Sequence, residues 1–241
     1  MRSAAEAAPS FLYVPDLALR GARLTLDGDA ARYVAKVVRA REGERLTASD
    51  GAGLLATLVV ECTRPDVQLA VTDVRRLAPP PVSCLWCGAP EGERGDWLVE
   101  KLGELGVTDF QPVDTERVSW PSSVRLDRWE RLAVAALRQS RSAWLMRLAL
   151  PVPLAQMVAD LPAGPARDQR WLADPDGVAV ASCDLPADGA VTGAVGPSSG
   201  FSQNERNLLS SHGFAAVGLA PLRLRTETAS VALAAHWAAR R

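Results

Sequence analysis

The sequence predicts an α/β protein in two parts, a small N-terminal β-barrel followed by a larger α/β domain. Short β-leaning runs separated by turn residues fill residues 11–77. The run Ala78-Pro79-Pro80-Pro81 then interrupts the chain, as linkers between domains do. Beyond it, strand and helix patterns alternate, which is typical of a mostly parallel sheet covered by helices. The predicted domains cover residues 11–77 and 78–241, after a disordered leader of residues 1–10.

The N-terminal part combines β-leaning segments with one helical patch. The segments are residues 24–26, 45–49, 54–62 and 67–74. In the helical patch, residues 29–41, Val34, Val37 and Val38 form an apolar stripe. Another face of this helix contains the basic residues Arg32, Lys36 and Arg39. This basic face could bind phosphates, and a merely solvated surface is the alternative.

In the C-terminal part, apolar runs and capping residues predict alternating strands and helices. The strands are residues 82–87, 110–113, 170–173, 191–195 and 215–219. The helices start at Asp96, at Asp127 with Glu130, at Ser202 with Glu205, and at Thr226 or Thr228. They end near Leu105, Trp144, Gly213 and Arg240, respectively.

Composition limits the kind of protein. With 27 basic and 28 acidic residues the net charge is −1, so any nucleic-acid contact must use a local basic surface. No run of 18 apolar residues occurs, so no membrane span is predicted. Four cysteines are too few for a disulfide framework, which indicates a cytoplasmic protein. Cys84 and Cys87 form a C-x-x-C, but positions three apart on a strand point to opposite faces, so no metal site is expected.

A turn rich in glycine and proline, residues 196–202, separates a predicted buried strand from a capped helix. The backbone can turn sharply there and approach a ligand, with a purely structural turn as the alternative. The turn also matches G-x-S-x-G, with Ser198 as the nucleophile of a serine hydrolase. The one suitable acid and histidine downstream, Glu227 and His236, would lie about 13–14 Å apart along a single helix. That separation makes a catalytic triad a poor fit.

Charged side chains gather immediately before the last predicted helix. Thr226, Glu227 and Thr228 suit a helix start, which is the purely structural explanation. It does not explain why Arg223 and Arg225 alternate with leucines. Such an arrangement can line a cleft with charge while the leucines pack beneath it.

At these residues the chain resembles the RsmE-like family, the ribosomal small-subunit RNA uridine-N3 methyltransferases of the SPOUT class. Residues 96–107 with Thr115-Glu116-Arg117 are similar to its K-x-x-E-L-G-V…T-E-R block. Residues 196–205 are similar to its G-P-E-G-G-F-S-x-x-E loop, and residues 219–229 to its L-G-x-R-I-L-R-T-E-T-A signature. A weaker Q-S block at Gln139-Ser140 and an N-terminal V-x-x-V-x-R also match.

The resemblance implies a PUA-like RNA-binding barrel followed by a SPOUT-type α/β domain with a C-terminal trefoil knot. Loops of the knot would bind S-adenosylmethionine, and two chains would pair as a homodimer. The implied substrate is a uridine N3 of ribosomal RNA, either as free RNA or within the 30S subunit.

The family's functional positions map onto this chain residue by residue. The cofactor-binding residues implied by the match are Leu172, Asp174, Gly196, Pro197, Ser198, Gly200, Leu219, Leu222, Leu224 and Thr226. Arg225 and Glu227 match the charged pair of the active cleft. In the uridine reaction, Arg225 would stabilise the anion that forms when N3 loses its proton. The RNA-binding residues would be Arg32, Lys36, Arg39, Arg117, Arg138 and Arg141.

The chain departs from the family pattern at three places. Ser198-Ser199 stands where the family has Glu-Gly, and Pro90-Glu91-Gly92 where it usually has P-K-G. The family's Q-S-G-R becomes Gln139-Ser140-Arg141-Ser142. A charge reversal at a phosphate-facing position weakens RNA contact. A catalytically degenerate RNA-binding paralogue that retains the knot is therefore the alternative function, with the Ser198 hydrolase behind it.

Overall fold

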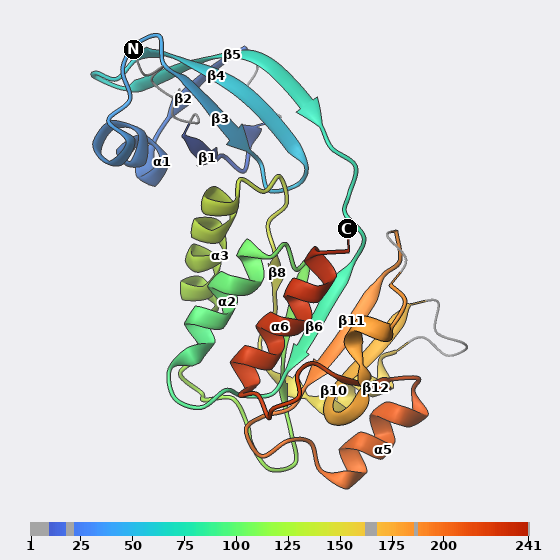
Figure 1. The fold of residues 1–241 in the computed structure, drawn as a ribbon. Helices are drawn as coiled ribbons and strands as arrows, with labels where there is room; N and C mark the ends of the chain where they lie inside the picture. Colours follow the sequence, from blue (N-terminus) through green and yellow to red (C-terminus); the bar gives the residue numbers. More distant parts are fainter. Residues whose placement is uncertain (1–9, 18–21, 162–167, 186–187, 241) are drawn as a thin grey trace, which may run out of the picture. The chain divides into compact units, whose positions relative to one another are not determined.

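The computed structural model describes residues 10–17, 22–161, 168–185 and 188–240 (Figure 1). The chain forms two compact units. The first contains Met1–Pro79 and Leu137–Leu145, and the second contains Pro80–Ala136 and Met146–Arg241. Segment Leu137–Leu145 thus packs with the N-terminal unit although it follows the proline-rich break. Apart from Ser10, the predicted leader lies outside the described residues.

A curled sheet forms most of the first unit (Figure 1). Its strands are β1 (Phe11–Tyr13), β2 (Arg23–Leu26), β3 (Arg45–Ser49), β4 (Leu54–Cys62) and β5 (Val67–Arg76), in the order β1-β3-β4-β5-β2. β1 pairs in parallel with β3, and the other pairs are antiparallel. Leu12, Leu46 and Leu58 are among the core residues that the curled sheet buries. The predicted segments 45–49 and 54–62 coincide with β3 and β4, whereas β1 was not predicted.

The predicted basic helix consists of a short α-helix, α1 (Gly28–Arg32), and a π-helical segment, Tyr33–Val38. The Arg39 N–H donates to the Val34 carbonyl, so this turn is wider than an α-helical turn. The wider turn changes which side chains share a face. Val34 is buried, but Val37 is 66% exposed, so the predicted apolar stripe is wrong at Val37. The stripe was derived from the 3.6-residue period of an α-helix.

Segment Leu137–Leu145 completes a second cluster of the first unit. Leu137 and Ala143 are buried together with Phe11 and Leu55. The Ala143 carbonyl accepts hydrogen bonds from the Ser49 hydroxyl, at 3.1 Å, and from the Gly53 N–H, at 3.0 Å. The segment is therefore a structural part of this unit and not a loose connection.

The second unit is built on a fully parallel sheet. Its strands are β6 (Ser83–Cys87), β7 (Asp109–Asp114), β8 (Arg147–Leu148), β9 (Val152–Pro153), β10 (Gln169–Ala179), β11 (Val191–Val195) and β12 (Ala215–Gly218). The order is β12-β10-β11-β6-β7-β8, with β9 also paired to β7. β10 is longer than the predicted strand 170–173. Its pairing with β12 is interrupted between Ala173 and Val178, so residues 174–177 bulge out of the ladder.

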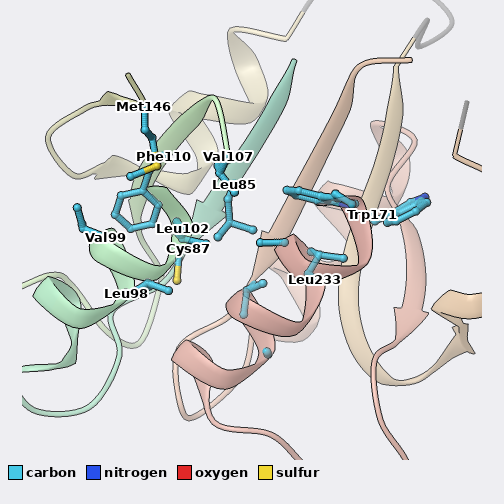
Figure 2. Close-up of a cluster of buried hydrophobic side chains, with 14 of the residues drawn as sticks. Leu85, Cys87, Leu98, Val99, Leu102, Val107, Phe110, Met146, Trp171 and Leu233 are labelled. Atoms are coloured by element: carbon cyan, nitrogen blue, oxygen red, sulfur yellow. The ribbon is translucent and has the colours of Figure 1, made fainter. Parts of the chain in front are cut away.

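Helices cover both faces of this sheet. On one face, α2 (Arg94–Glu104), α3 (Leu126–Ser140) and α6 (Thr226–Ala238) pack on a large apolar cluster. Figure 2 shows Leu98 and Leu102 of α2 and Leu233 of α6 beside Phe110 and Trp171 of the sheet. On the other face, α4 (Leu154–Ala159) and α5 (Gln203–Ser211) cover a second cluster. None of the helices in the described ranges is long and apolar enough to span a membrane.

Two predicted helix starts are wrong by one or more residues. α2 begins at Arg94, so Asp96 is inside its first turn, where its carboxylate accepts a hydrogen bond from Trp129 Nε1 instead of capping the helix. α3 begins at Leu126, so Asp127 also lies inside the helix and forms ion pairs with arginines. α3 ends at Ser140, before the predicted Trp144, because Arg141 adopts a left-handed φ of 58°.

The predicted start of α5 is confirmed. Ser202 and Glu205 form a complete capping box, in which each side chain accepts from the other residue's N–H. For α6, the residue before the helix is Arg225, and Thr226 is its first residue. The Thr226 hydroxyl donates to the Gly196 carbonyl at 3.0 Å, so it joins two loops instead of capping the helix.

Candidate functional site

A cavity of about 300 Å³ opens at the carboxyl ends of β11 and β12, beside the bulge in β10. Ligand sites of parallel α/β sheets form at this edge. The walls come from the bulge in β10, the loop after β11 and the loop after β12. They combine leucine side chains with the charged groups of Asp174, Asp176, Arg206 and Arg223. We call this space the first cavity.

The loop after β11 is held in a tight conformation. At Gly196, a Cβ atom would lie 2.9 Å from the Phe201 nitrogen, closer than the backbone allows. The Gly200 N–H donates to the Pro197 carbonyl at 2.8 Å, which closes the turn. Arg223 Nη2 donates to the Ser198 carbonyl at 2.8 Å and so ties this turn to the loop after β12.

The buried carboxylate of Glu205 organises the base of the same region. Its Oε2 accepts from the Ser202 N–H and its Oε1 from the Glu116 N–H, both at 2.7 Å. Glu116 belongs to the predicted T-E-R block after β7. One side chain therefore accepts hydrogen bonds from two backbone donors and links two of the sequence blocks.

A second cavity of about 320 Å³ adjoins the first. Its wall is mostly charged, and its lining residues are Glu91, Arg94, Ser198, Arg223, Leu224, Arg225, Thr226 and Glu227. Ser198, Arg223, Leu224 and Thr226 also line the first cavity, so the two spaces share a wall. Two molecules bound in the two cavities would therefore be in contact at this wall.

Of the two predicted active-cleft residues, Arg225 and Glu227, Glu227 forms an ion pair with a third residue, Arg94. Arg225 is exposed, whereas Glu227 is buried. Glu227 Oε1 lies 3.0 Å from Nη1 of Arg94, the first residue of α2. The sequence analysis did not identify Arg94 as a site residue, because it expected the helix to start at Asp96 and Arg94 to lie in the preceding turn.

The structure brings together the residues that the family match singled out in the second unit. Each predicted cofactor residue, from Leu172 to Thr226, lines the first cavity, and Arg225 and Glu227 line the second. Phe201, Arg206 and Arg223 of the first cavity and Arg94 of the second were missing from the predicted set. The sequence offered a signal for two of them: Phe201 lies in the family's loop match, and Arg223 alternates with leucines.

The predicted RNA-binding residues lie in both units. Arg32, Lys36, Arg39, Arg138 and Arg141 belong to the first unit and Arg117 to the second. Arg39 and Arg141 both adopt the left-handed backbone conformation, with φ values of 54° and 58°. The Arg138 guanidinium stacks over the Tyr33 ring at 4.8 Å, which places the end of α3 against the π-helical segment. This stacking contact shows that the basic residues of the first unit come from two stretches of the chain.

The cysteines and histidines do not contribute to the cavities. Burial raises the pKa of the Cys84 and Cys87 thiols to about 12, so both are neutral at physiological pH. They pack on opposite faces of the sheet, as the strand period predicts. Among the described residues, no histidine lines either cavity. Ser198 therefore lacks the base that a serine hydrolase requires.

Comparison with known proteins identifies the family. Residues 78–238 match the model of an RNA methyltransferase domain, and residues 26–62 match that of an RNA methyltransferase PUA domain. A ribosomal RNA small subunit methyltransferase E from Synechocystis is 31% identical over 221 residues, covering 88% of this chain and 72% of that protein. The chain belongs to the ribosomal RNA small subunit methyltransferase E family.

Solved structures with similar folds agree with this family assignment. A ribosomal RNA small subunit methyltransferase E from Neisseria gonorrhoeae, bound to S-adenosyl methionine, is 25% identical with a TM-score of 0.81 and covers 95% of this chain and 96% of its own. A putative methyltransferase from Legionella pneumophila, in complex with bound SAM, is 26% identical with a TM-score of 0.79 and covers 96% of this chain and 98% of its own. The likeness to the small subunit methyltransferase E family thus extends over both units of the chain.

Proposed function

We propose that this protein is an S-adenosylmethionine-dependent methyltransferase that modifies N3 of a uridine in small-subunit ribosomal RNA. The observation that carries the proposal is the pair of adjoining cavities. The predicted cofactor residues line the first, and the predicted catalytic residues Arg225 and Glu227 line the second. The names of the relatives support the reaction, and the cofactor in the Neisseria and Legionella structures supports the methyl donor.

The first cavity fits S-adenosylmethionine chemically. Leu172, Leu219 and Leu224 provide apolar contact for an adenine ring, and the tight loop at Gly196 leaves backbone groups close to the space. Asp174 and Arg206 offer charges for hydroxyl, ammonium and carboxylate groups. When bound, the cofactor supplies a methyl group on a positively charged sulfur, which needs no metal.

The second cavity fits the acceptor base. Uridine N3 carries a proton that must leave before or during methylation, and the negative charge then spreads onto the uracil oxygens. Arg225 is the group that stabilises this charge, since it is exposed and lines the cavity. The buried Glu227 carboxylate lines the same cavity and is held by Arg94. Its role is to accept the proton or to orient Arg225.

Three further features belong to the same proposal: a trefoil knot, a homodimer and a cytoplasmic location. Between Glu227 and Arg240, α6 carries no Asp, Glu, Lys or Arg, so it lacks the charged face that is typical of a surface helix. A monomeric mass in light scattering at micromolar concentration would contradict the dimer. The knot is tested by joining the two termini covalently, because an unfolded circle that contains a trefoil migrates faster than an unknotted circle.

One observation favours the alternative, a binding protein without turnover. Ser198 and Ser199 replace the Glu-Gly of the family loop, and Ser198 lines both cavities. A carboxylate is thus absent from the shared wall. An RNA-binding protein that has lost methyl transfer would keep the fold and the first unit.

The test begins with calorimetric titration of the protein with S-adenosylmethionine. We expect saturable binding in the wild type and at least about tenfold weaker binding in Gly196→Ala, because the added Cβ collides with the Phe201 backbone. Ser210→Ala, on an exposed position of α5, is the control. Absence of binding to the wild type, alone and with 30S subunits, would contradict the proposal.

Methyl transfer is then measured on 30S subunits that lack the modification. N3-methyluridine cannot pair, so it stops reverse transcription at one position. We expect a new stop with the wild type and none with Arg225→Ala, whose cofactor affinity stays unchanged because Arg225 lines only the second cavity. Cofactor binding without any stop would favour the degenerate paralogue.

A further inference from the structure

Glu227 is a buried carboxylate that depends on one long-range contact. It is 6% exposed, and its cationic partner among the described residues is Arg94, at 3.0 Å. The Arg94 side chain is 39% exposed and comes from a different helix. A buried carboxylate without a cation or hydrogen-bond donor is costly and takes up a proton instead. Arg94 is thus the group that compensates the buried charge of Glu227.

The pair stands at the start of two helices. Arg94 is the first residue of α2, and Glu227 is the second residue of α6. Both helix N-termini therefore meet at the second cavity, which both residues line. The partial positive charge of a helix N-terminus stabilises a carboxylate and also an anionic ligand.

The other charged groups near Glu227 are one acidic residue and two arginines of the cavity wall. The titratable and charged neighbours are Cys87 of β6, whose buried thiol is neutral, and the cavity residues Glu91, Arg223 and Arg225. Without Arg94, the arginines left in the cavity wall are Arg223, which donates to the Ser198 carbonyl, and Arg225, which would then pair with Glu227. Arg225 would then no longer be available to the substrate.

We propose that Arg94 is a positioning residue for methyl transfer: by pairing with Glu227 it fixes that carboxylate in the acceptor cavity and leaves Arg225 free for the substrate base. The inference rests on the proposed function, because it assigns a role within that reaction. Arg94 lines the second cavity and not the first, so its effect falls on the acceptor side.

The test compares Arg94→Leu and Arg94→Lys with a matched control, Arg128→Leu. Arg128 lies in α3 and pairs with Asp96, which is in α2 like Arg94. Arg128 lines neither cavity. We expect Arg94→Leu to lower kcat at least about tenfold, with the Kd for S-adenosylmethionine within about twofold of the wild type. Arg94→Lys should restore part of the rate, since it restores the charge but not the guanidinium geometry. Arg128→Leu should behave as the wild type.

Two readouts separate positioning from general destabilisation. The first is the partial rescue by Arg94→Lys, because a side chain that only filled space would not need to be a cation. In a double-mutant cycle on thermal unfolding, Glu227→Gln should cancel most of the destabilisation by Arg94→Leu. The cycle needs no activity, so it tests the pair even if the wild type transfers no methyl group. An unchanged kcat in Arg94→Leu, or additive effects in the cycle, would overturn the proposal.

Discussion

Glu205 shows how a single side chain can hold two loops of the site. It is 5% exposed, and both carboxylate oxygens accept backbone N–H groups, from Ser202 and from Glu116. Hydrogen bonds to an ionised acceptor are stronger than neutral ones, and a buried donor left without a partner is costly. The carboxylate is thus needed for the geometry of the loop that lines the first cavity.

Glu205→Gln should therefore destabilise the protein more than its small change in shape suggests. The amide group must turn one N–H donor toward a backbone N–H, which we expect to cost about 1–3 kcal/mol in the free energy of unfolding. Urea denaturation monitored by circular dichroism measures it. Glu104→Gln removes a surface ion pair with Lys101 and should cost below about 1 kcal/mol. Equal losses of stability in the two variants would contradict this account of Glu205.

Local sequence signals identified residues at the site only where the interaction itself was local. Ser202 and Glu205 are three residues apart, so the capping box was readable, and it is present. The Glu205 bond to Glu116 and the Arg94 contact with Glu227 join residues that are distant along the chain. Pattern periods describe one element at a time and carry no information on such pairs.

At the scale of elements, α6 is the helix that most of the site depends on. Its first turn borders the cavities, and its Leu233 and Trp237 pack in the main core of the second unit. His236, near its end, packs against Trp171 with ring centroids 5.8 Å apart. Burial, together with the charge of Arg240, lowers the pKa of His236 below its ordinary value of 6.5.

The lowered pKa predicts that acid weakens the folded state. The unfolded chain binds the proton of His236 near pH 6.5, while the folded chain resists it, so stability is complete above that pH and falls as pH decreases below it. We expect the melting temperature to drop less in His236→Gln than in the wild type between about pH 7.5 and 5.5.

The chain's other histidine provides the matched control. His212→Gln should retain the wild-type decrease in melting temperature, since His212 lies at the end of α5 and not in this contact. A pH dependence that is identical in the wild type and His236→Gln would show that another group is responsible.

Element types were more predictable than element ends. Strands 45–49, 54–62 and 191–195 were predicted with their observed bounds, because β-branched and apolar runs ended at turn residues. The π-helical segment and the bulge in β10 were not predicted, since both break the regular period. The bulge places Asp174 in the wall of the first cavity, so an irregular feature helps to form the site.

For the whole molecule, a net charge of −1 means that RNA affinity has to come from local basic residues. Lys36 and Arg39 are exposed on the first unit. Replacing both with glutamine should weaken binding of a 30S-derived RNA and reduce the magnitude of the salt slope by about 0.7–0.9 for each phosphate that the variant no longer neutralises. Filter binding between low and high salt measures the slope. Arg125→Gln removes an arginine already paired with Asp127 and is the control, and an equal slope in both variants would contradict the assignment.

The discontinuous first unit has a consequence for the protein's synthesis. A chain emerges from the ribosome N-terminus first, and domains usually complete their folding in that order. Here Leu137 and Ala143 fill the cluster around Phe11 and Leu55, so the earliest stretch of the protein cannot be finished when residue 79 emerges. It must wait while β6, α2, β7 and most of α3 are translated. A nascent chain that stalls before residue 137 carries an incomplete apolar cluster, which is the feature that chaperones and quality-control proteases recognise.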